Sequence, residues 1–393
     1  MTRPLLIIFL TIFVNLVGFG IIIPLLPFYA ETFGASPLVI GFLFAVFSLC
    51  QLVAAPVLGD LSDRYGRRPV LVFSLAGTVI SFVMLALAHS VWMLFAARIV
   101  DGLSGGNIST ARAYVADVTE PQDRAKAYGL IGAAFGLGFI LGPALSGVLA
   151  GISYTAPIWA AAAITLVATV MAWLWLPETV HRAHAGTGNP LAHLRALWRR
   201  PLVRRILTID FIYWFAFAIF QTTLSLFAAR RFGFGPAETG YFFAAFGVLG
   251  ALVQGGLIRP VVHRLGDKRT FLLGLACGST GLVATALSHS VTMFVLSLLP
   301  LALGLGFGHP TMTSLVSRVA RGDEQGRVQG AASAVESLGR TIGPVWGYAS
   351  LQHLGESTPY ISAAALLLLT FLLSVGIHVT ESEPIKIDSL DPG

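Results

Sequence analysis

Charged side chains are scarce in this sequence: Asp, Glu, Lys and Arg make up 11% of its 393 residues, whereas hydrophobic residues make up 55%. A soluble domain carries about 25% charged residues. With a mean hydropathy of +0.79, the chain has more apolar surface than one core can bury, so lipid must be its solvent. The scarcity of charge therefore excludes an ordinary soluble protein.

Cysteine is nearly absent as well. Cys50 and Cys277 both lie inside apolar runs, where we interpret them as free, buried residues outside any disulfide framework. The histidines are scattered over helix ends and the central polar segment, so they form no group of metal ligands or nucleophile partners. We therefore predict no enzyme activity, no cofactor and no metal site.

Apolar runs long enough to cross a bilayer dominate the rest of the chain, and a polar segment at 180–203 divides them into two sets of six. The first run is too long for a cleavable signal, so we interpret it as a spanning helix. The predicted fold is an all-α membrane protein with twelve helices, at approximately 5–28, 38–58, 70–88, 91–116, 125–149, 157–176, 204–228, 238–258, 270–288, 291–316, 328–350 and 358–379. The predicted parts are an N-terminal six-helix half (1–179), a linker with a short amphipathic helix (180–203), a C-terminal half (204–380) and a disordered tail (381–393).

Two short segments recur about 200 residues apart. The charged turn Gly59–Pro69 has a relative at Arg259–Arg269, and the joint His89-Ser90 returns as His289-Ser290. Recurrence at half the chain length indicates two similar halves.

The positive charges predict the orientation. With the N-terminus in the cytoplasm, 20 of the 25 Lys and Arg residues lie on the cytoplasmic side and two lie outside, as the positive-inside rule requires. We therefore expect a multi-pass protein of the plasma (bacterial inner) membrane with both termini cytoplasmic. The basic residues are spread over five short loops that face anionic lipid, so we expect no nucleic-acid partner. Since each half can bury its polar face against the other, we expect a monomer.

Charged residues inside the predicted helices are the strongest functional signal. A charge at the bilayer centre costs at least about 2.5 kcal/mol and normally faces a cavity or a partner. Arg98 and Asp101 are three residues apart on the fourth helix, and Glu336 and Arg340 are four apart on the eleventh, so each pair shares a helix face. Asp101 is the first candidate for a proton-carrying carboxylate and Glu336 the second. The alternative is that both are ion pairs that only neutralise each other.

Other residues have weaker signals. Arg112 is expected to pair with Asp117, and Asp210 is interpreted as an interfacial charge beside Arg204 and Arg205. His309-Pro310 is expected to kink the tenth helix, with a proton relay as the alternative. Uncharged polar residues that complete a plausible cavity are Asn15, Gln51, Asn107, Gln221 and Gln254, and the aromatic residues Tyr213, Trp214, Phe215 and Phe217 offer it an apolar wall.

The turn between the second and third helices resembles a signature of the major facilitator superfamily. It reads Gly-x-Leu-x-Asp-Arg-x-Gly-Arg-Arg from Gly59 to Arg68. A run that begins at Arg98 resembles the second signature of that superfamily. Glycines and a proline in the fifth helix resemble the signature of drug/proton antiporters: Gly129, Gly138, Gly142, Pro143 and Gly147. Short sequence segments such as Ala113–Asp117 and Gln325–Gly330 are most similar to the tetracycline/proton antiporter branch.

The resemblance implies a role for the turn as a cytoplasmic gate. Asp63 would face the start of the eleventh helix, and Arg67 would pair with Asp117 at the end of the fourth. A carboxylate at a helix N-terminus contributes roughly 0.3–1 kcal/mol. The implied gate residues are Gly59, Asp63, Arg64, Gly66, Arg67, Arg68 and Asp117. The chain departs from the branch at Asn15, Ser81 and Gly278, where an acidic residue is expected.

The resemblance implies a secondary active transporter that exports a small organic molecule, drug-like or metabolite, in exchange for protons. Its partners would be that substrate, protons and the lipid bilayer. An uncoupled facilitator or a lipid or metabolite transporter of the same fold is the alternative, and the missing acid at Asn15 favours it.

Overall fold

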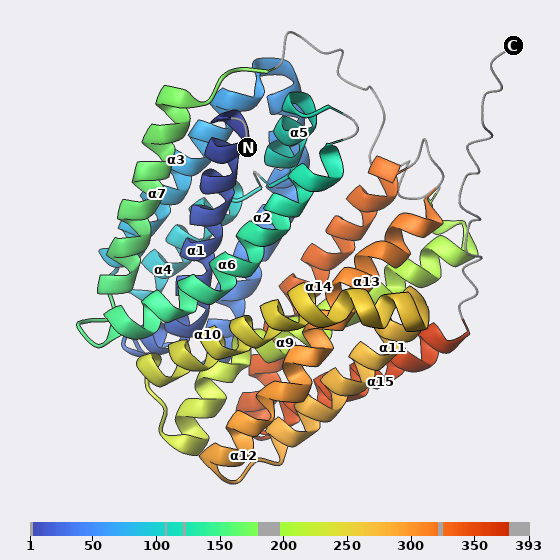
Figure 1. The fold of residues 1–393 in the computed structure, drawn as a ribbon. Coiled ribbons are helices and arrows are strands. Elements are labelled where there is room, and N and C mark those ends of the chain that lie inside the picture. The colour runs from blue at the N-terminus through green and yellow to red at the C-terminus, as the bar shows by residue number, and fades with distance from the viewer. Residues whose placement is uncertain (1–2, 107, 121–122, 180–196, 321–324, 377–393) are drawn as a thin grey trace, which may run out of the picture.

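The computed structural model describes residues 3–106, 108–120, 123–179, 197–320 and 325–376. The described part of the chain is helical throughout, and the helices form two halves (Figure 1). The N-terminal half holds α1 (Arg3–Glu31), α2 (Pro37–Tyr65), α3 (Arg67–Ala86), α4 (Val91–Ser104), α5 (Ile108–Val118), α6 (Arg124–Ala150) and α7 (Ala156–Trp175). The C-terminal half holds α9 (Pro201–Phe232), α10 (Pro236–Leu252), the π-helix η1 (Val253–Leu257), α11 (Ile258–Ala286), α12 (Val291–Leu296), α13 (Leu298–Val319), α14 (Gln325–His353) and α15 (Thr358–Val375).

These elements correspond to the twelve predicted helices. α4 and α5 together form the fourth, and α12 and α13 together form the tenth. The eighth and ninth run together as α10, η1 and α11, with a break at Gly266, whose φ is 77°. Among the described residues, nine helical segments are long and apolar enough to cross a membrane. The difference from twelve arises because 236–286 forms one continuous segment, and because the fourth and eleventh helices are interrupted or more polar.

The internal repeat is visible in local geometry. Gly66 and Gly266, 200 positions apart, both adopt a positive φ, which glycine tolerates without steric cost. Ser90 and Ser290 both cap a helix N-terminus by accepting a hydrogen bond from the backbone N–H three residues on. The two recurring segments therefore build the same reversal and the same cap in each half.

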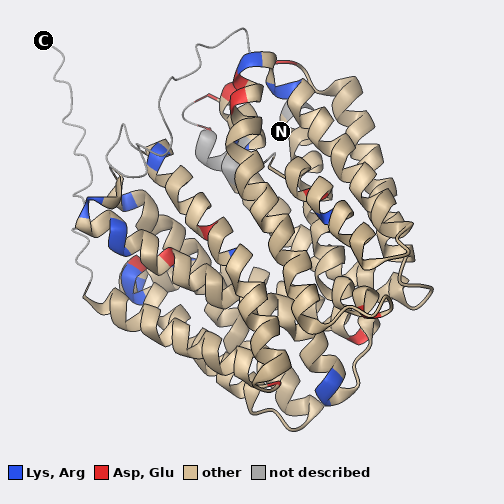
Figure 2. Cartoon of the chain, turned by 180° about the vertical axis from the view of Figure 1, so that it is seen from behind, with Lys and Arg blue, Asp and Glu red and all other residues tan. Residues whose placement is uncertain are grey.

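The ends of the helices define two sides of the molecule. We call the side with the starts of α1 and α9 and the ends of α7 and α15 the linker side. Figure 2 shows most Lys, Arg, Asp and Glu segments on this side, with a few inside the helical body and a few at the opposite end. The predicted amphipathic helix and the tail lie largely or wholly outside the described residues.

The two halves contact each other on the side opposite the linker. α2 packs against α14, α6 against α10, and α1 against α9 and α10. Here the backbone N–H of Leu38 donates to Gln352 Oε1 at 3.0 Å, and the rings of Phe44 and Tyr348 stack with centroids 6.3 Å apart. Toward the linker side the ribbons of the two halves separate (Figure 1).

Candidate functional site

The ion pair predicted in the fourth helix is present and buried. Arg98 Nη1 lies 2.6 Å from Asp101 Oδ2, and the Arg98 side chain is 1% exposed. The guanidinium covers the ring of Phe47 in α2, with Cζ 4.1 Å from the ring centroid. α4 lies so close to α2 that a Cβ at Gly102 would be 2.5 Å from the Phe47 carbonyl oxygen. The pair therefore lies between α4 and α2 and lines neither cavity described below.

A second group of ionisable side chains lies where α9, α13 and α14 meet. Arg340 Nη2 lies 4.0 Å from Glu336 Oε2, and Arg340 Cζ lies 5.0 Å from the ring centroid of Trp214. The Trp214 ring meets the His309 ring edge-on at 5.4 Å. Asp210, one turn before Trp214, interacts electrostatically with both Glu336 and Arg340. These five side chains are called the C-half polar cluster below.

The interpretation of Asp210 as an interfacial charge is wrong. α9 begins at Pro201, so Asp210 lies nine residues, or roughly 14 Å, along the helix. Its side chain is 1% exposed, and its Oδ2 has no hydrogen-bond partner among the described residues. The available signal was its i, i+4 spacing with Trp214, which places the carboxylate on the helix face that carries this aromatic residue.

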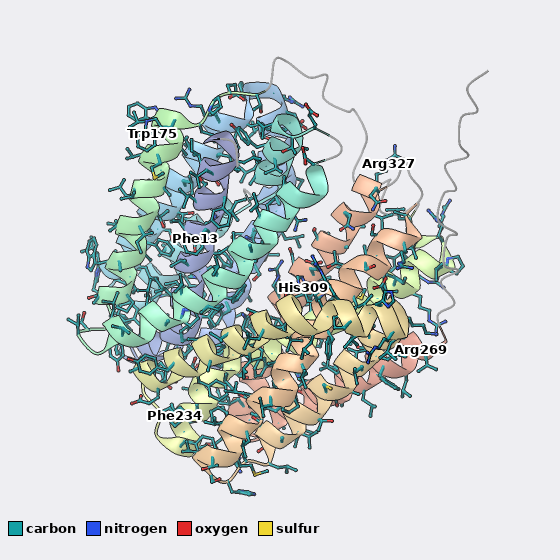
Figure 3. The ribbon with its side chains drawn as sticks, in the orientation of Figure 1. Phe13, Trp175, Phe234, Arg269, His309 and Arg327 are labelled. Carbon is teal, nitrogen blue, oxygen red and sulfur yellow. The ribbon has the colours of Figure 1, made fainter. Side chains whose placement is uncertain are left out.

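Arg112 faces the C-half polar cluster from the other half of the molecule. Asp117, its expected partner, binds Arg67 instead. Arg112 is exposed and interacts electrostatically with Glu336 and His309. His309 is also exposed and lies near the centre of the molecule (Figure 3). Charged groups of the two halves thus interact electrostatically with each other.

The charged turn between α2 and α3 forms an ion-pair network on the linker side. Arg67 Nη1 lies 2.5 Å from Asp63 Oδ1, and Arg67 Nε lies 3.2 Å from Asp117 Oδ2 at the end of α5. Arg67 Nη1 also donates to Ser62 Oγ at 2.7 Å. The contact of Asp63 with the start of the eleventh helix stays a prediction for a state in which the linker side is closed.

The remaining residues of this turn have different surroundings. Arg64 forms an exposed ion pair with Asp60 at 3.0 Å, which contributes about 1 kcal/mol at most. Arg68 donates to the backbone carbonyl of Trp173 in α7. Open space surrounds the position of a Cβ at Gly59. Close packing therefore requires only some of the residues in the Gly59–Arg68 signature.

Glu178, which follows α7, caps the start of α3. Its Oε1 accepts a hydrogen bond from the Arg67 backbone N–H at 2.8 Å, and its Oε2 accepts one from the Arg68 backbone N–H at 3.2 Å. A Cβ at Gly66 would lie 2.3 Å from this carboxylate. Gly66 is therefore required both by its φ of 109° and by the carboxylate beside it.

We expect Glu178→Gln to lower the free energy of unfolding by about 0.5–2 kcal/mol, because a charged acceptor at a helix N-terminus becomes neutral. Thermal unfolding of the purified protein measures this loss. The matched control is Glu356→Gln, which removes a carboxylate from a loop on the opposite side. Equal melting temperatures for all three proteins would contradict the cap.

The glycines of the fifth helix, α6, have two kinds of neighbour. A Cβ at Gly138 or Gly142 would lie 2.6 or 2.7 Å from atoms of α1, in the same half. A Cβ at Gly147 would lie 2.9 Å from a backbone oxygen of α10, in the other half. Pro143 lies within this contact region, whereas Gly129 has open space around it. The signature therefore holds α6 against both α1 and α10.

The uncharged polar residues predicted to complete a cavity have different surroundings where the structure describes them. Gln51 donates to the Gly105 carbonyl at 2.9 Å and so connects α2 to the end of α4. Gln221 is buried in α9, and Gln254 is exposed in η1. Asn15 lies half-buried in α1, and Asn107 lies outside the described residues. Within the described chain, no group of His, Cys, Asp and Glu side chains has the arrangement of a metal site.

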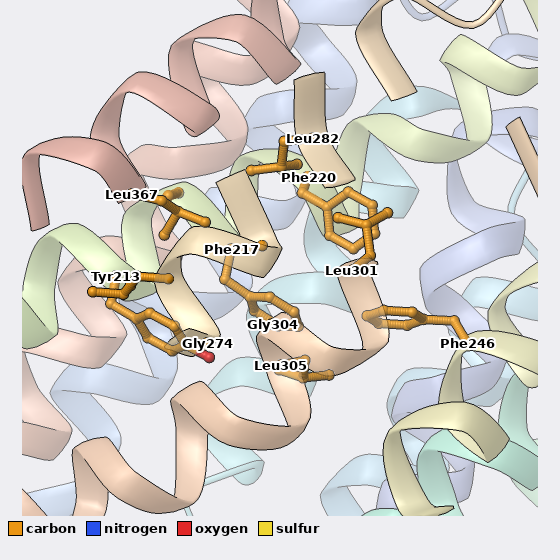
Figure 4. Close-up of a pocket in the computed structure, with 13 residues that line it drawn as sticks. Tyr213, Phe217, Phe220, Phe246, Gly274, Leu282, Leu301, Gly304, Leu305 and Leu367 are labelled. Carbon is orange, nitrogen blue, oxygen red and sulfur yellow. The ribbon is translucent and has the colours of Figure 1, made fainter. Parts of the chain in front are cut away.

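An apolar pocket of about 40 Å³ lies inside the C-terminal half (Figure 4). Tyr213, Phe217 and Phe220 of α9 form one wall, and residues of α10, α11, α13 and α15 complete it. Gly278, where the antiporter branch has an acidic residue, is part of this lining. The Ser81 position lies buried in α3. Position 278, where an acidic residue is expected, therefore lies in the apolar wall of this pocket.

Comparisons with known proteins agree on one family. The family model described as Major Facilitator Superfamily matches residues 8–344 and 255–390. The chain is 34% identical to the class C tetracycline resistance protein of Escherichia coli, over 93% of this chain and 95% of that protein. It is 31% identical to multidrug resistance protein 2 of Bacillus subtilis, over 94% and 92%. The structure is similar to the human organic anion transporter MFSD10, with a TM-score of 0.74, 27% identity and coverage of 95% and 99%.

Proposed function

Because the chain belongs to the major facilitator superfamily, a family of transporters rather than enzymes, we propose that it exports a small organic molecule in exchange for protons. The observation that carries this proposal is the arrangement of the two halves. They pack together on one side, and ionisable side chains lie between or inside them at membrane depth. Such an arrangement supports alternating access, in which the halves rock about a central site.

The proposed orientation places the linker side in the cytoplasm. The positive-inside rule supports it, since this side carries most of the Lys and Arg residues. Both termini then lie in the cytoplasm. The proposed protein is a monomer of the plasma membrane. In the described conformation the opposite, external side is closed, and substrate enters from the cytoplasm.

The proposed substrate is a drug-like molecule or metabolite with an apolar part. The pocket behind Tyr213 and Phe217 offers space for such a part. The relatives named above include tetracycline and multidrug resistance proteins and an organic anion transporter. Asn15 and Gly278 replace acids of the tetracycline branch, which favours a substrate other than tetracycline.

Asp101 is the proposed proton-coupling carboxylate, with Arg98 as its partner. Burial disfavours the charged form of a carboxylate and a neighbouring guanidinium favours it, so a small movement of α4 changes the balance between them. The measurement is proton release in weak buffer when a drug-like molecule such as ethidium is added to the purified protein, with tetracycline as the comparison that is expected to release fewer protons.

We expect release from the wild-type protein and none from Asp101→Asn, with ligand binding retained. Release that persists in Asp101→Asn would move the coupling to Glu336. Binding without release in either protein would favour the second candidate function, an uncoupled facilitator, for which Asn15 in place of an acid is the supporting observation.

A further inference from the structure

The C-half polar cluster contains a buried carboxylate oxygen without a hydrogen-bond donor. Asp210 is 1% exposed, and its Oδ2 is unpartnered among the described residues. The same side chain lines a small cavity of about 20 Å³, together with Trp214, His309, Thr313, Gln329 and Glu336. The residue with the unpartnered oxygen therefore lines a space that a small group can occupy.

The charges around this cavity are unbalanced within the C-terminal half. Asp210 and Glu336 supply two negative charges and repel each other, whereas Arg340 supplies one positive charge. Arg340 lies over the Trp214 ring, 4.0 Å from Glu336, which is too long for a hydrogen bond. One carboxylate charge in the C-terminal half is thus left without a counter-charge from the same half.

The neighbouring helices do not supply the missing donor to Asp210 Oδ2. Tyr213 of α9 and Glu336 and Arg340 of α14 interact electrostatically with the carboxylate, yet Oδ2 makes no hydrogen bond. His309 of α13 lines the same cavity. Arg112 belongs to the other half and faces Glu336 and His309, so its distance from the cluster changes when the halves rock.

A buried carboxylate without a partner costs several kcal/mol, so such a group normally binds a counter-charge or a proton. Besides the two carboxylates, the lining offers the oxygen atoms of Thr313 and Gln329 as acceptors, and among the described residues its only cationisable side chain is His309. A cavity of this size holds about one water-sized group, such as the ammonium group at the end of a larger molecule. Inside a membrane, an ionisable residue of this kind marks a binding site or a proton path.

We propose that Asp210, together with Glu336, forms a site for one positively charged hydrogen-bond donor: a proton, or the ammonium group of a transported molecule. This inference deepens the proposed function. It rests on that function only in identifying the cation as part of a transported molecule. The two carboxylates bind the cation, and Arg340 limits the site to a single positive charge by neutralising the other carboxylate. The apolar pocket is lined by Tyr213, which interacts electrostatically with Asp210, and it accommodates the apolar part of the same molecule.

Infrared spectroscopy of the purified protein tests the proton arm, because a protonated carboxyl group has a C=O band that a carboxylate lacks. We expect this band in the wild-type protein and in the control Asp60→Asn, which removes a surface carboxylate. Asp210→Asn is expected to lose the band, and Asp210→Glu to shift it. Identical spectra for wild type and Asp210→Asn across the whole pH range, with no response to ammonium, would overturn the site.

Binding of an ammonium group is tested with 2-phenylethylammonium. The neutral 2-phenylethanol and the anionic 3-phenylpropionate serve as comparison probes of similar size. We expect the ammonium probe to remove the C=O band of the wild-type protein and to release a proton into weak buffer. The other two probes are expected to do neither. Loss of the band in Asp210→Asn without any effect of the ammonium probe would identify the proton as the occupant. If Asp210→Asn fails to fold, the shifted band of Asp210→Glu supplies the assignment, because this variant keeps the carboxyl group.

These measurements need no membrane gradient and no transport, so they separate the two proposals. A protein that shows the Asp210 band but carries solutes independently of a proton gradient would retain the site and refute the proton-coupled exporter. A protein that exchanges protons for solute while Asp210→Asn has the wild-type spectrum would retain the exporter and refute the site.

Discussion

Replacement of Gly240 by alanine is expected to disfavour the conformation described here and to reduce transport strongly. A Cβ at Gly240 would lie 2.6 Å from the Cα and N atoms of Gly147 and 2.7 Å from the Pro143 carbonyl oxygen. All three are backbone atoms of α6, so the contact is relieved only if α6 and α10 move apart. Overpacking of this kind costs about 1–3 kcal/mol, which changes the ratio of two conformations by roughly 5- to 150-fold.

The distance between spin labels at the ends of α6 and α10 opposite the linker measures this effect. We expect the Gly240→Ala distances to shift toward longer values, with unchanged overall folding. Gly250→Ala is the matched control in the same helix, since open space surrounds its Cβ position. Unchanged distances and full transport in Gly240→Ala would show that this contact does not hold the opposite side closed.

Replacement of Arg98 by methionine is expected to destabilise the protein by about 3–5 kcal/mol, because it leaves the Asp101 carboxylate buried without its partner. The Arg98 side chain is 1% exposed and that of Asp101 8%, and the guanidinium packs against Phe47 of α2. The double variant Arg98→Met/Asp101→Leu is expected to recover most of the loss, since it removes both charges. Thermal unfolding in detergent measures the three stabilities and their coupling.

The same set of Arg98 and Asp101 variants distinguishes an ion pair with a purely structural role from a proton-coupling site. A stable double variant that still transports solute in a proton-dependent way would show that the pair only neutralises itself, as the alternative interpretation holds. A stable double variant without proton release would support the role proposed for Asp101. An Arg98→Met protein as stable as wild type would contradict the buried position of the pair.

Most of the architecture could be predicted from the sequence, because lipid requires every spanning segment to satisfy its own backbone hydrogen bonds. The twelve helices, the division near the linker and the repeat of Gly66 at Gly266 follow from apolar run length and turn residues, and the structure confirms the all-helical fold. Arg98 and Asp101 could be paired from their spacing alone, since residues three apart share a helix face. The functional roles of these residues stay predictions.

The tertiary structure alone decided which helix faces meet. Spacing placed Glu336 beside Arg340 but could not bring Asp210, Trp214 and His309 to them, because these residues come from other helices whose rotation depends on packing. Asp210 lies close in sequence to two arginines, yet the start of α9 at Pro201 places it well inside the helix. The contact of Gly147 with Gly240 likewise joins two halves whose relative position no local pattern specifies. The sequence by itself thus determined the helices, their repeat and their charges, whereas the meeting of α9, α13 and α14 around one unpartnered carboxylate was set by long-range packing.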